Sequence, residues 1–338
     1  MKATIKDIAR HAGVSVSTVS MALSGKETRI AAITKQKILE SAHTLNYRRN
    51  HLARALVTKK TRTLGIVLPD ISNEFFAKIA KGIGYEAKKN DYRIMLLDTN
   101  EDPEQDVVAV NMLLECSVDG ILYIHAAGGH SHNAAACVAL CQTEGIPLVL
   151  LDRVPDAISA NAVLVNQEKG GYLAMHHLLS LGHIHIGCIT GSLSTPSSRA
   201  RLDGCYKALH EAGISPIPQL LAEGEFHADS GYAHTQALLD AGATAVFAFN
   251  DLIAYGVYRY ARDKGLRVPQ DLSLMGFDDN NFSEIMETPL TTIHQPTFSL
   301  GVAAVQKMMQ HLNGSPTTIA STIFEPRLII RKSTGGAP

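Results

Sequence analysis

Apolar residues at the start of the chain recur at helical spacing. They are Ile5, Ile8, Ala9 and Ala12. Because residues three and four positions apart lie on the same side of a helix, this spacing predicts a first short helix with one apolar face. Thr4 is suited to cap its beginning, Asp7 places a carboxylate in its first turn, where the helix dipole favours it, and Gly13 is suited to end it.

Two more amphipathic helices are expected before residue 46. The second runs from about Val16 to Ser24, with Ser15 as its N-cap. The third covers residues 33–45, and its apolar stripe is Ile38, Leu39, Ala42 and Leu45. Two short helices joined by a tight glycine turn, with small Ala9 at the expected crossing, predict a helix-turn-helix.

From Thr63 onward, short apolar runs alternate with amphipathic stretches. The expected strands are residues 64–68, 93–97, 120–124, 148–151, 186–190, 245–249 and 272–276, and the expected helices include 75–89, 170–181, 199–212 and 251–264. Continuous apolar strands that alternate with helices indicate parallel sheets covered on both faces. Two successive arrays predict an α/β core of two doubly wound subdomains, whose ligands would bind at the carboxyl ends of the strands.

The distribution of charge also separates the first 62 residues from the rest of the chain. The net charge of the 338 residues is −1, but residues 1–62 hold thirteen Lys or Arg against Asp7, Glu27 and Glu40, a net of +10, which leaves −11 for the rest. A basic segment of this density is typical of binding to a phosphate backbone, and the alternative is an ordinary solvated basic surface.

The remaining composition excludes several classes of protein. Apolar residues make up 46% of the chain and charged residues 19%, which is typical of a globular protein, and no apolar run approaches eighteen residues. The N-terminus has no apolar block of the kind found in a signal peptide, and five cysteines without CxxC spacing predict buried thiols in a reducing cytoplasm. We therefore expect a cytoplasmic protein without a membrane span.

The N-terminal motifs resemble the LacI/GalR family of transcriptional regulators. They are TIKDIARHAGVSVSTVS at residues 4–20, Leu45-Asn-Tyr, and Leu52-Ala-Arg-Ala-Leu56, and the resemblance extends over essentially the whole chain. It implies a sequence-specific DNA-binding repressor whose second helix reads base edges in the major groove through Val16, Ser17 and Met21. The family often has Arg or His where this chain has Met21, which could instead contact a thymine methyl group. The DNA-binding residues expected are Thr4, Ser15, Val16, Ser17, Thr18, Met21, Asn50, Ala53 and Leu56.

Residues 48–60 resemble the family's hinge helix. In that family the helix inserts a leucine into the minor groove, and Leu56 matches the leucine while Ala53 matches its close neighbour. An inserted leucine unstacks a base step and bends the duplex. Arg49 stands where the family commonly has proline, and the alternative for the segment is a plain basic linker helix.

The larger part of the chain looks like the family's effector domain, a type I periplasmic-binding-protein fold. Polar and aromatic residues that directly follow the predicted strands are similar, position by position, to those of bacterial ribose-binding proteins. They are Asn73, Phe75, Phe76, Asp152, Arg153, Arg201, Phe226, Asn250, Phe277, Asp278 and Gln295. Aromatic faces cover the C–H surfaces of a sugar, and carboxylates, guanidinium groups and amides bond its hydroxyls. D-ribose or a related pentose is the expected effector, acting as inducer; the alternative for any one of these residues is that it simply ends a strand.

The expected domains follow from these assignments: a DNA-binding domain at 1–47, a hinge at 48–61 and an effector core at 62–338. The core would divide into an N-subdomain (about 62–162 and 293–322) and a C-subdomain (about 163–292 and 323–338). We expect a homodimer on a near-palindromic operator, since a two-fold protein matches a two-fold site and the chain shows no C-terminal leucine heptads.

Other functions are less well supported. A secreted solute-binding protein would share the core but not the basic helix-turn-helix, and a purine or hexose is the alternative effector. No catalytic grouping can be named, so no enzyme activity or cofactor is expected. The histidines His125, His130 and His132, and the pair His183 and His185, lack the spacing of a zinc site, so no metal is expected. Gln306 and Gln310 stand where relatives that bind a phosphocarrier protein have Arg and Lys, so we do not expect that partner.

Overall fold

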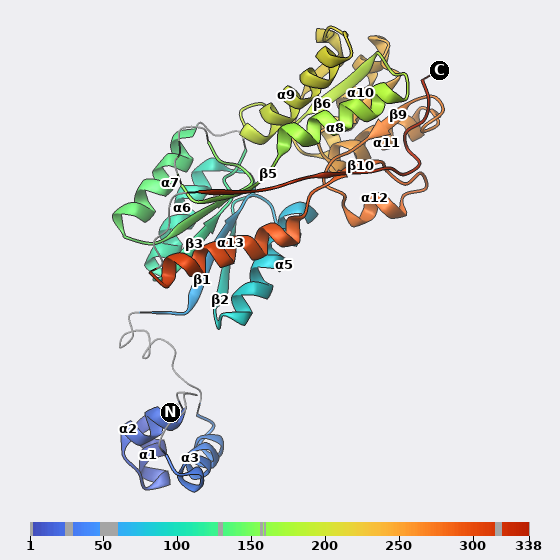
Figure 1. Ribbon diagram of the computed structural model, residues 1–338. Helices are drawn as coiled ribbons and strands as arrows, with labels where there is room; N and C mark the ends of the chain where they lie inside the picture. The colour runs from blue at the N-terminus through green and yellow to red at the C-terminus, as the bar shows by residue number, and fades with distance from the viewer. Residues whose placement is uncertain are drawn as a thin grey trace. The chain divides into compact units, whose positions relative to one another are not determined.

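The computed structural model describes residues 3–23, 30–47, 60–127, 131–155, 158, 160–314 and 320–337. The chain divides into two compact units, residues 1–61 and 62–338. Figure 1 shows the helices of the first unit and the sheets and helices of the second. The two units are described separately.

The first unit contains α1 (Ile5–Ala12), α2 (Val16–Leu23) and α3 (Ala32–Thr44). Thr4 and Asp7 form a capping box at the start of α1: the Thr4 backbone N donates to Asp7 Oδ2 at 2.9 Å, and the Asp7 backbone N donates to Thr4 Oγ1 at 3.4 Å. Gly13 ends α1 with φ of 66°, a left-handed conformation that glycine adopts without strain. The predicted helix-turn-helix is therefore confirmed.

The core of this unit differs from the predicted stripe at one position. The buried apolar side chains are Ile8, Ala9, Ala12, Val19, Ala22 and Ile38. Leu39 is 48% exposed, so its predicted place in the core is wrong. Ser41 is buried instead, because its hydroxyl donates to the Lys37 carbonyl at 2.8 Å and lies 3.0 Å from His11 Nδ1. Hydrogen bonding lets a polar residue occupy the inner face of α3.

The second unit begins with a six-stranded parallel sheet in the order β11-β5-β4-β3-β1-β2. Its strands are β1 (Thr63–Leu68), β2 (Arg93–Asp98), β3 (Gly120–Tyr123), β4 (Leu148–Leu151), β5 (Ala162–Val165) and β11 (Ser321–Phe324). One face packs against α5 (Glu74–Lys89) and α13 (Thr297–Leu312), and the other against α6 (Pro103–Glu115) and α7 (Ser131–Thr143). This sheet and its four helices form the first half of the core (Figure 1).

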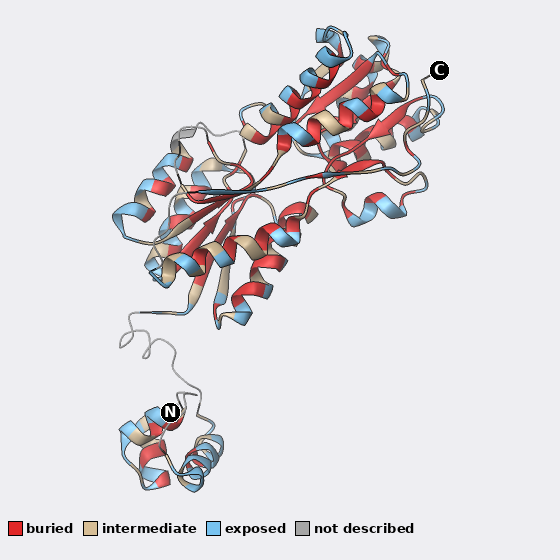
Figure 2. Cartoon of the chain, in the orientation of Figure 1, coloured by how far each residue is buried: buried red, intermediate tan, exposed pale blue. Residues whose placement is uncertain are grey.

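The second half is built on a four-stranded parallel sheet in the order β7-β6-β8-β9. Its strands are β6 (Ile186–Thr190), β7 (Leu221–Glu223), β8 (Ala245–Ala248) and β9 (Ser273–Met275). One face packs against α8 (Gln167–Ser180) and α9 (Pro196–Glu211), and the other against α10 (Ala228–Asp240) and α11 (Asp251–Asp263). A 3-10 turn (Pro218–Leu220) precedes β7, and the short helix α12 (Asn281–Ile285) follows β9. Figure 2 shows both sheets buried between exposed outer helix faces.

Three segments connect the halves. The chain passes from β5 to α8, returns through β10 (Thr292–His294) into α13, and passes again from β11 to β12 (Arg327–Ile329), which pairs antiparallel with β10. The crossings lie after β5 and β11, slightly later in the chain than the expected limits at 162 and 322. The doubly wound α/β class is confirmed, although β5, β7, β10, β11 and β12 were not among the predicted strands.

Candidate functional site

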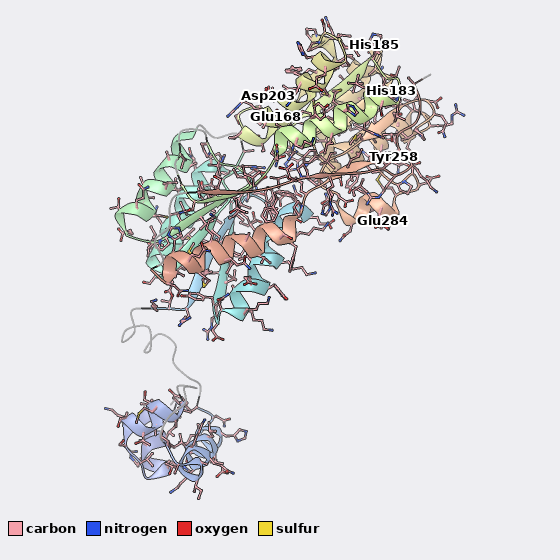
Figure 3. All side chains as sticks on the ribbon, viewed as in Figure 1. Glu168, His183, His185, Asp203, Tyr258 and Glu284 are labelled. Atoms are coloured by element: carbon pink, nitrogen blue, oxygen red, sulfur yellow. The ribbon has the colours of Figure 1, made fainter. Side chains whose placement is uncertain are left out.

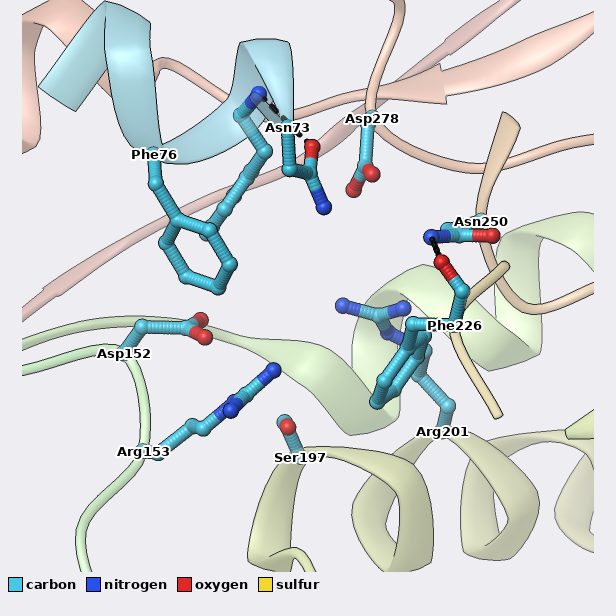
Figure 4. A pocket seen from close by; sticks show the side chains of 10 residues that line it. Asn73, Phe76, Asp152, Arg153, Ser197, Arg201, Phe226, Asn250 and Asp278 are labelled. Carbon is cyan, nitrogen blue, oxygen red and sulfur yellow. Dashed lines mark hydrogen bonds between the residues drawn. The ribbon is translucent and has the colours of Figure 1, made fainter. Parts of the chain in front are cut away.

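A cleft lies where strands of both halves end. The space among its side chains, part of which is open to solvent, is about 290 Å³, and Figure 4 shows the side chains that surround it. The lining residues are Asn73, Phe75, Phe76, Asp152, Arg153, Ser197, Arg201, Phe226, Asn250 and Asp278. Asp152 and Arg153 follow β4 of the first half, whereas Asn250 and Asp278 follow β8 and β9 of the second half. The cleft is therefore at the carboxyl ends of parallel strands, where such folds bind ligands.

Aromatic rings from both halves line the cleft. Phe75 and Phe76, in the first turn of α5, pack edge to face with ring centroids 5.1 Å apart. Phe226 reaches the cleft from the segment after β7. The Arg153 guanidinium carbon lies 5.2 Å from the Phe76 ring centroid and 5.6 Å from that of Phe226, so this side chain contacts aromatic rings of both halves.

Arg153 is held in place by Glu101, a residue that the sequence analysis did not identify. Arg153 Nη1 and Nη2 donate to Glu101 Oε2 and Oε1 at 2.8 and 2.9 Å, a two-point contact that fixes the plane of the guanidinium group. The Ala127 backbone N also donates to Glu101 Oε2 at 2.6 Å. Burial opposes ionisation of Glu101, but Arg153 and the Ala127 N–H outweigh it and lower the pKa of this carboxyl.

Arg201, from α9, is almost completely buried. Its Nε donates to Gln167 Oε1 at 2.8 Å, its Nη1 donates to the Phe249 carbonyl, and its guanidinium carbon lies 3.7 Å from the Phe277 ring centroid. Burial lowers the pKa of this guanidinium, and the nearby carboxylates Asp278 and Asp152 oppose that shift. The contacts fix Arg201 in one orientation at the edge of the cleft.

The two aspartates of the cleft are buried as well. Asp278 Oδ1 accepts a hydrogen bond from Gln295 Nε2 at 2.7 Å, and Asp152 Oδ1 accepts one from Gln167 Nε2 at 3.2 Å. Burial raises the pKa of both carboxyls, most strongly that of Asp278, although Arg201 lies close to each. These carboxylates are suited to accept hydrogen bonds from ligand hydroxyls.

Three helices begin at the cleft. Asn73 caps α5, since its Oδ1 accepts from the Phe75 backbone N at 3.0 Å, and Asn250 caps α11 in the same way, accepting from the Ile253 N at 2.8 Å. Ser197 lies in the first turn of α9. Each asparagine oxygen is thus engaged by its own helix, which orients the amide group at the edge of the cleft.

Nine of the eleven predicted ligand residues line the cleft, and Phe277 and Gln295 do not. Phe277 is fully buried in the core beneath α8 and α9, where it supports Arg201, and Gln295 lies behind Asp278. Ser197 lines the cleft but was not predicted, because its place after Pro196 resembles an ordinary helix start. The ligand-binding roles of all these residues remain predictions.

The predicted DNA-reading residues lie on and around α2. Val16 and Met21 are 42% and 48% exposed, although large apolar side chains are usually buried. Ser15 and Ser17 are exposed and Thr18 is partly buried; Ser15 Oγ accepts from the Thr18 N at 3.1 Å and so caps α2. Thr4 is exposed within its capping box. Asn50, Ala53, Leu56 and the expected hinge helix lie outside the described residues.

The structure also accounts for a histidine considered as a metal ligand. His183 is buried, with Nδ1 2.8 Å from Thr244 Oγ1 and Nε2 3.1 Å from Ser273 Oγ, so both ring nitrogens are engaged in the fold. Figure 3 shows His183, and the exposed acids Glu168, Asp203 and Glu284, on the second half. Within the described residues, no three His, Cys, Asp or Glu side chains are grouped to hold a metal ion. No helix in the same part of the chain is long and apolar enough to cross a membrane.

Comparison with known families gives two matches. The family described as "Bacterial regulatory proteins, lacI family" matches residues 4–50. The family described as "Periplasmic binding protein-like domain" matches residues 175–334. The two matches cover the helix-turn-helix and much of the second half of the core.

Several curated relatives match along nearly the whole chain. The HTH-type transcriptional regulator DegA of Bacillus subtilis (strain 168) is 35% identical over 99% of this chain and 98% of its own length. The HTH-type transcriptional repressor PurR of Aliivibrio salmonicida is 33% identical, and the ribose operon repressor of Haemophilus influenzae 34% identical, each over 98% of both chains. These relatives are transcriptional regulators and not enzymes.

Solved structures agree with this placement. A lac repressor dimer bound to operator and the anti-inducer ONPF matches with a TM-score of 0.89 and 30% identity, over 99% of this chain and 100% of that one. A LacI family regulator from Enterococcus faecium with bound ribose matches with a TM-score of 0.73 and 30% identity, over 82% of this chain and 100% of that one. The chain therefore belongs to the LacI family of DNA-binding transcriptional repressors with a ligand-binding core.

Proposed function

We propose that D-ribose, or a closely related pentose, binds in the cleft and acts as an inducer that releases the repressor from operator DNA. The observation that carries this proposal is the pairing of aromatic rings with buried carboxylates. Phe75, Phe76 and Phe226 offer apolar faces to the C–H surface of a sugar, while Asp152 and Asp278 offer acceptors to its hydroxyls. Wrong hydroxyl patterns would leave these buried groups unmatched, at a cost of about 1–3 kcal/mol each.

The charges of the cleft favour an uncharged ligand. Two lining carboxylates, Asp152 and Asp278, face two lining guanidinium groups, Arg153 and Arg201, and the Arg153 charge is already matched by Glu101. An anionic ligand would meet two buried carboxylates without a surplus of positive charge, and desolvation would strengthen the repulsion. A neutral polyol avoids that cost.

The comparisons with known proteins support a ribose effector. The ribose operon repressor and the ribose-bound Enterococcus faecium regulator are among the similar proteins. Transcriptional repressors named PurR match with comparable identity. The purine considered in the sequence analysis stays the competing effector.

Control of DNA binding would follow from the position of the cleft between the two halves. A ligand that contacts both halves favours one closure angle, and it can shift that equilibrium only by its differential affinity, typically about 1–3 kcal/mol. The exposed surface of α2, with Val16, Ser17 and Met21, would read base edges, and the hinge with Leu56 would bend the operator.

We also propose that the repressor is a homodimer. Phe282 and Ile285, both in α12, are 52% and 75% exposed, and Tyr255 packs edge to face on Phe282 with ring centroids 5.1 Å apart. Exposed large apolar side chains that lie together are typical of protein interfaces. A two-fold dimer would present two helix-turn-helix units to two operator half-sites.

Titration calorimetry on the full-length protein tests the effector. D-ribose, other pentoses, hexoses, hypoxanthine and ribose 5-phosphate should be compared, and we expect heat from D-ribose and a much weaker response to the phosphorylated sugar. Operator DNA selected from a random library would then be used in fluorescence anisotropy, where D-ribose should weaken binding. If millimolar ribose gives no heat of binding and no change in the Tm of the protein, the assignment of D-ribose as effector is overturned. A response to hypoxanthine alone would replace ribose with a purine effector.

A further inference from the structure

Gln167 forms a hydrogen-bond junction behind the cleft. It is the first residue of α8, directly after the chain has crossed from the first half to the second. Its Oε1 accepts from Arg201 Nε at 2.8 Å, and its Nε2 donates to Asp152 Oδ1 at 3.2 Å and to Gln295 Oε1 at 3.0 Å. All three hydrogen bonds therefore join Gln167 to side chains that were predicted to bind ligand, namely Arg201, Asp152 and Gln295.

The direction of these hydrogen bonds is fixed by chemistry. Arg201 can only donate, so it must face the carbonyl oxygen of Gln167, and the amino group of Gln167 then faces its two acceptors. Gln295 accepts from Gln167 and donates through Nε2 to Asp278 Oδ1 at 2.7 Å. The result is a chain Arg201–Gln167–Gln295–Asp278 that begins at a guanidinium group and ends at a carboxyl group, with Asp152 as a branch.

This chain joins the two halves of the core. Asp152 follows β4 of the first half, while Arg201 and Asp278 belong to the second half. Gln167 and Gln295 each stand at a crossing segment, one after β5 and the other after β10. Both glutamines are buried, and neither lines the cleft, so they would act on a ligand only through the residues they hold.

We propose that Gln167 is a positioning residue that orients Arg201 and joins the ligand-binding carboxylates of the two halves into one network. This inference rests on the proposed role of the cleft as the effector site. An ordinary buried glutamine would fill space and satisfy its own amide. Gln167 instead connects a cation with two carboxylates of separate halves, and its amide supplies donor and acceptor in the only arrangement that these partners accept.

Replacement by glutamate isolates this role. In Gln167→Glu the acceptor for Arg201 is kept, but the two donors are lost and a carboxylate faces Asp152 Oδ1 and Gln295 Oε1. The other charged groups around Asp152 are Arg153, Glu101, Arg201 and Asp278. A proton on the introduced carboxyl restores one donor, so the damage should be larger at about pH 8 than at about pH 5.5.

The first test needs no ligand. Thermal unfolding of the full-length protein should show a lower Tm for Gln167→Glu than for wild type, and the difference should shrink on acidification. In an Asp152→Asn background the facing carboxylate is absent, so the pH dependence of the difference should largely disappear. Gln142→Glu, an exposed position on α7, is the matched control and should leave Tm unchanged at both pH values. A Tm difference that is constant with pH, or one that Asp152→Asn does not alter, would overturn the proposal.

The second test uses D-ribose as the probe in calorimetry. Gln167→Met, which keeps the length of the side chain and introduces no charge, should weaken ribose binding about tenfold or more, and Gln167→Glu should recover affinity relative to wild type as the pH falls. If wild type binds ribose and the Gln167 variants bind it with the same affinity, the positioning role is refuted and the proposed effector stands. Wild type that does not bind ribose would refute the proposed effector, while the unfolding test still decides whether the network exists.

Discussion

Two glycines of α5 should respond oppositely to the same substitution. A Cβ added at Gly82 would lie 2.2 Å from the Phe298 carbonyl oxygen of α13, whereas a Cβ at Gly84 would meet no heavy atom within 4 Å. The same close contact exists from the side of α13, because a Cβ added at Gly301 would lie 2.2 Å from the Ile79 carbonyl oxygen of α5. The two helices therefore cross backbone against backbone at Gly82, and the same helix is open at Gly84.

The expected magnitudes follow from these distances. Alanine is favoured over glycine inside a helix by about 0.5–1 kcal/mol, so Gly84→Ala should stabilise the core by that amount and raise Tm by roughly 1–4 °C. Gly82→Ala gains the same helix propensity but must push α13 away, and overpacking of this kind costs about 1–3 kcal/mol or more. We expect a net loss of stability for Gly82→Ala.

The same pair tests whether α5 positions the cleft. Phe75 and Phe76 lie in the first turn of α5, so a displaced helix should weaken effector binding in Gly82→Ala and not in Gly84→Ala. Urea unfolding and calorimetry on both variants measure the two effects. Equal stabilisation by both substitutions, or a Gly82→Ala protein with wild-type stability and affinity, would show that the close crossing of α5 and α13 does not constrain this region.

Five further outcomes are expected. Deleting residues 1–61 should abolish operator binding and leave ribose binding intact, and operator affinity of the full chain should fall steeply with salt in anisotropy titrations, because counterion release dominates it. Leu56→Ala should reduce operator affinity and DNA bending in a gel-shift assay without changing sugar affinity. Arg201→Ala should abolish sugar binding, so that the variant holds operator whether or not ribose is present, as anisotropy would show. Burial raises the pKa of Asp251 to about 6, above its ordinary value, so the folded state favours the neutral acid; the stability difference between wild type and Asp251→Asn in urea unfolding should therefore decrease as pH rises from about 4 to 6.

The strand ends could be predicted from the sequence because strong apolar runs define them. Asp152 and Arg153 directly follow the run 148–151, which is also the observed extent of β4, and both line the cleft. The position of a residue after a strand indicates the edge of the sheet but not the direction of the side chain. Phe277 illustrates this limit: it is in the same core cluster as Phe247 and Met275, beneath α8 and α9, while the next residue, Asp278, faces the cleft.

Residues that the sequence did not reveal lie beyond weakly patterned strands. Gln167 follows β5, a four-residue strand that was not predicted, so nothing marked its position as a strand end. Glu101 lies a few residues beyond the end of β2. This strand is at the edge of its sheet, and its side chains are only partly buried. Each owes its place to a partner distant in the chain, Arg201 or Arg153, and such pairings depend on the assembled fold rather than on local spacing.

The backbone departs from ordinary conformations at the cleft, as it does at several turns elsewhere among the described residues. Asp152 and Asp278 have φ of 57° and 115°, and the neighbouring Asp279 has φ of 61°. Residues other than glycine adopt a positive φ at a cost of order 1–3 kcal/mol. Such a conformation persists only where the surrounding structure holds it. Glycine at either position would relieve the strain but would remove a carboxylate that Gln167 or Gln295 contacts. Because both halves of the core hold a buried aspartate in this way at a strand end, this conformation would, under the proposed effector role, aim two acceptors at one shared ligand.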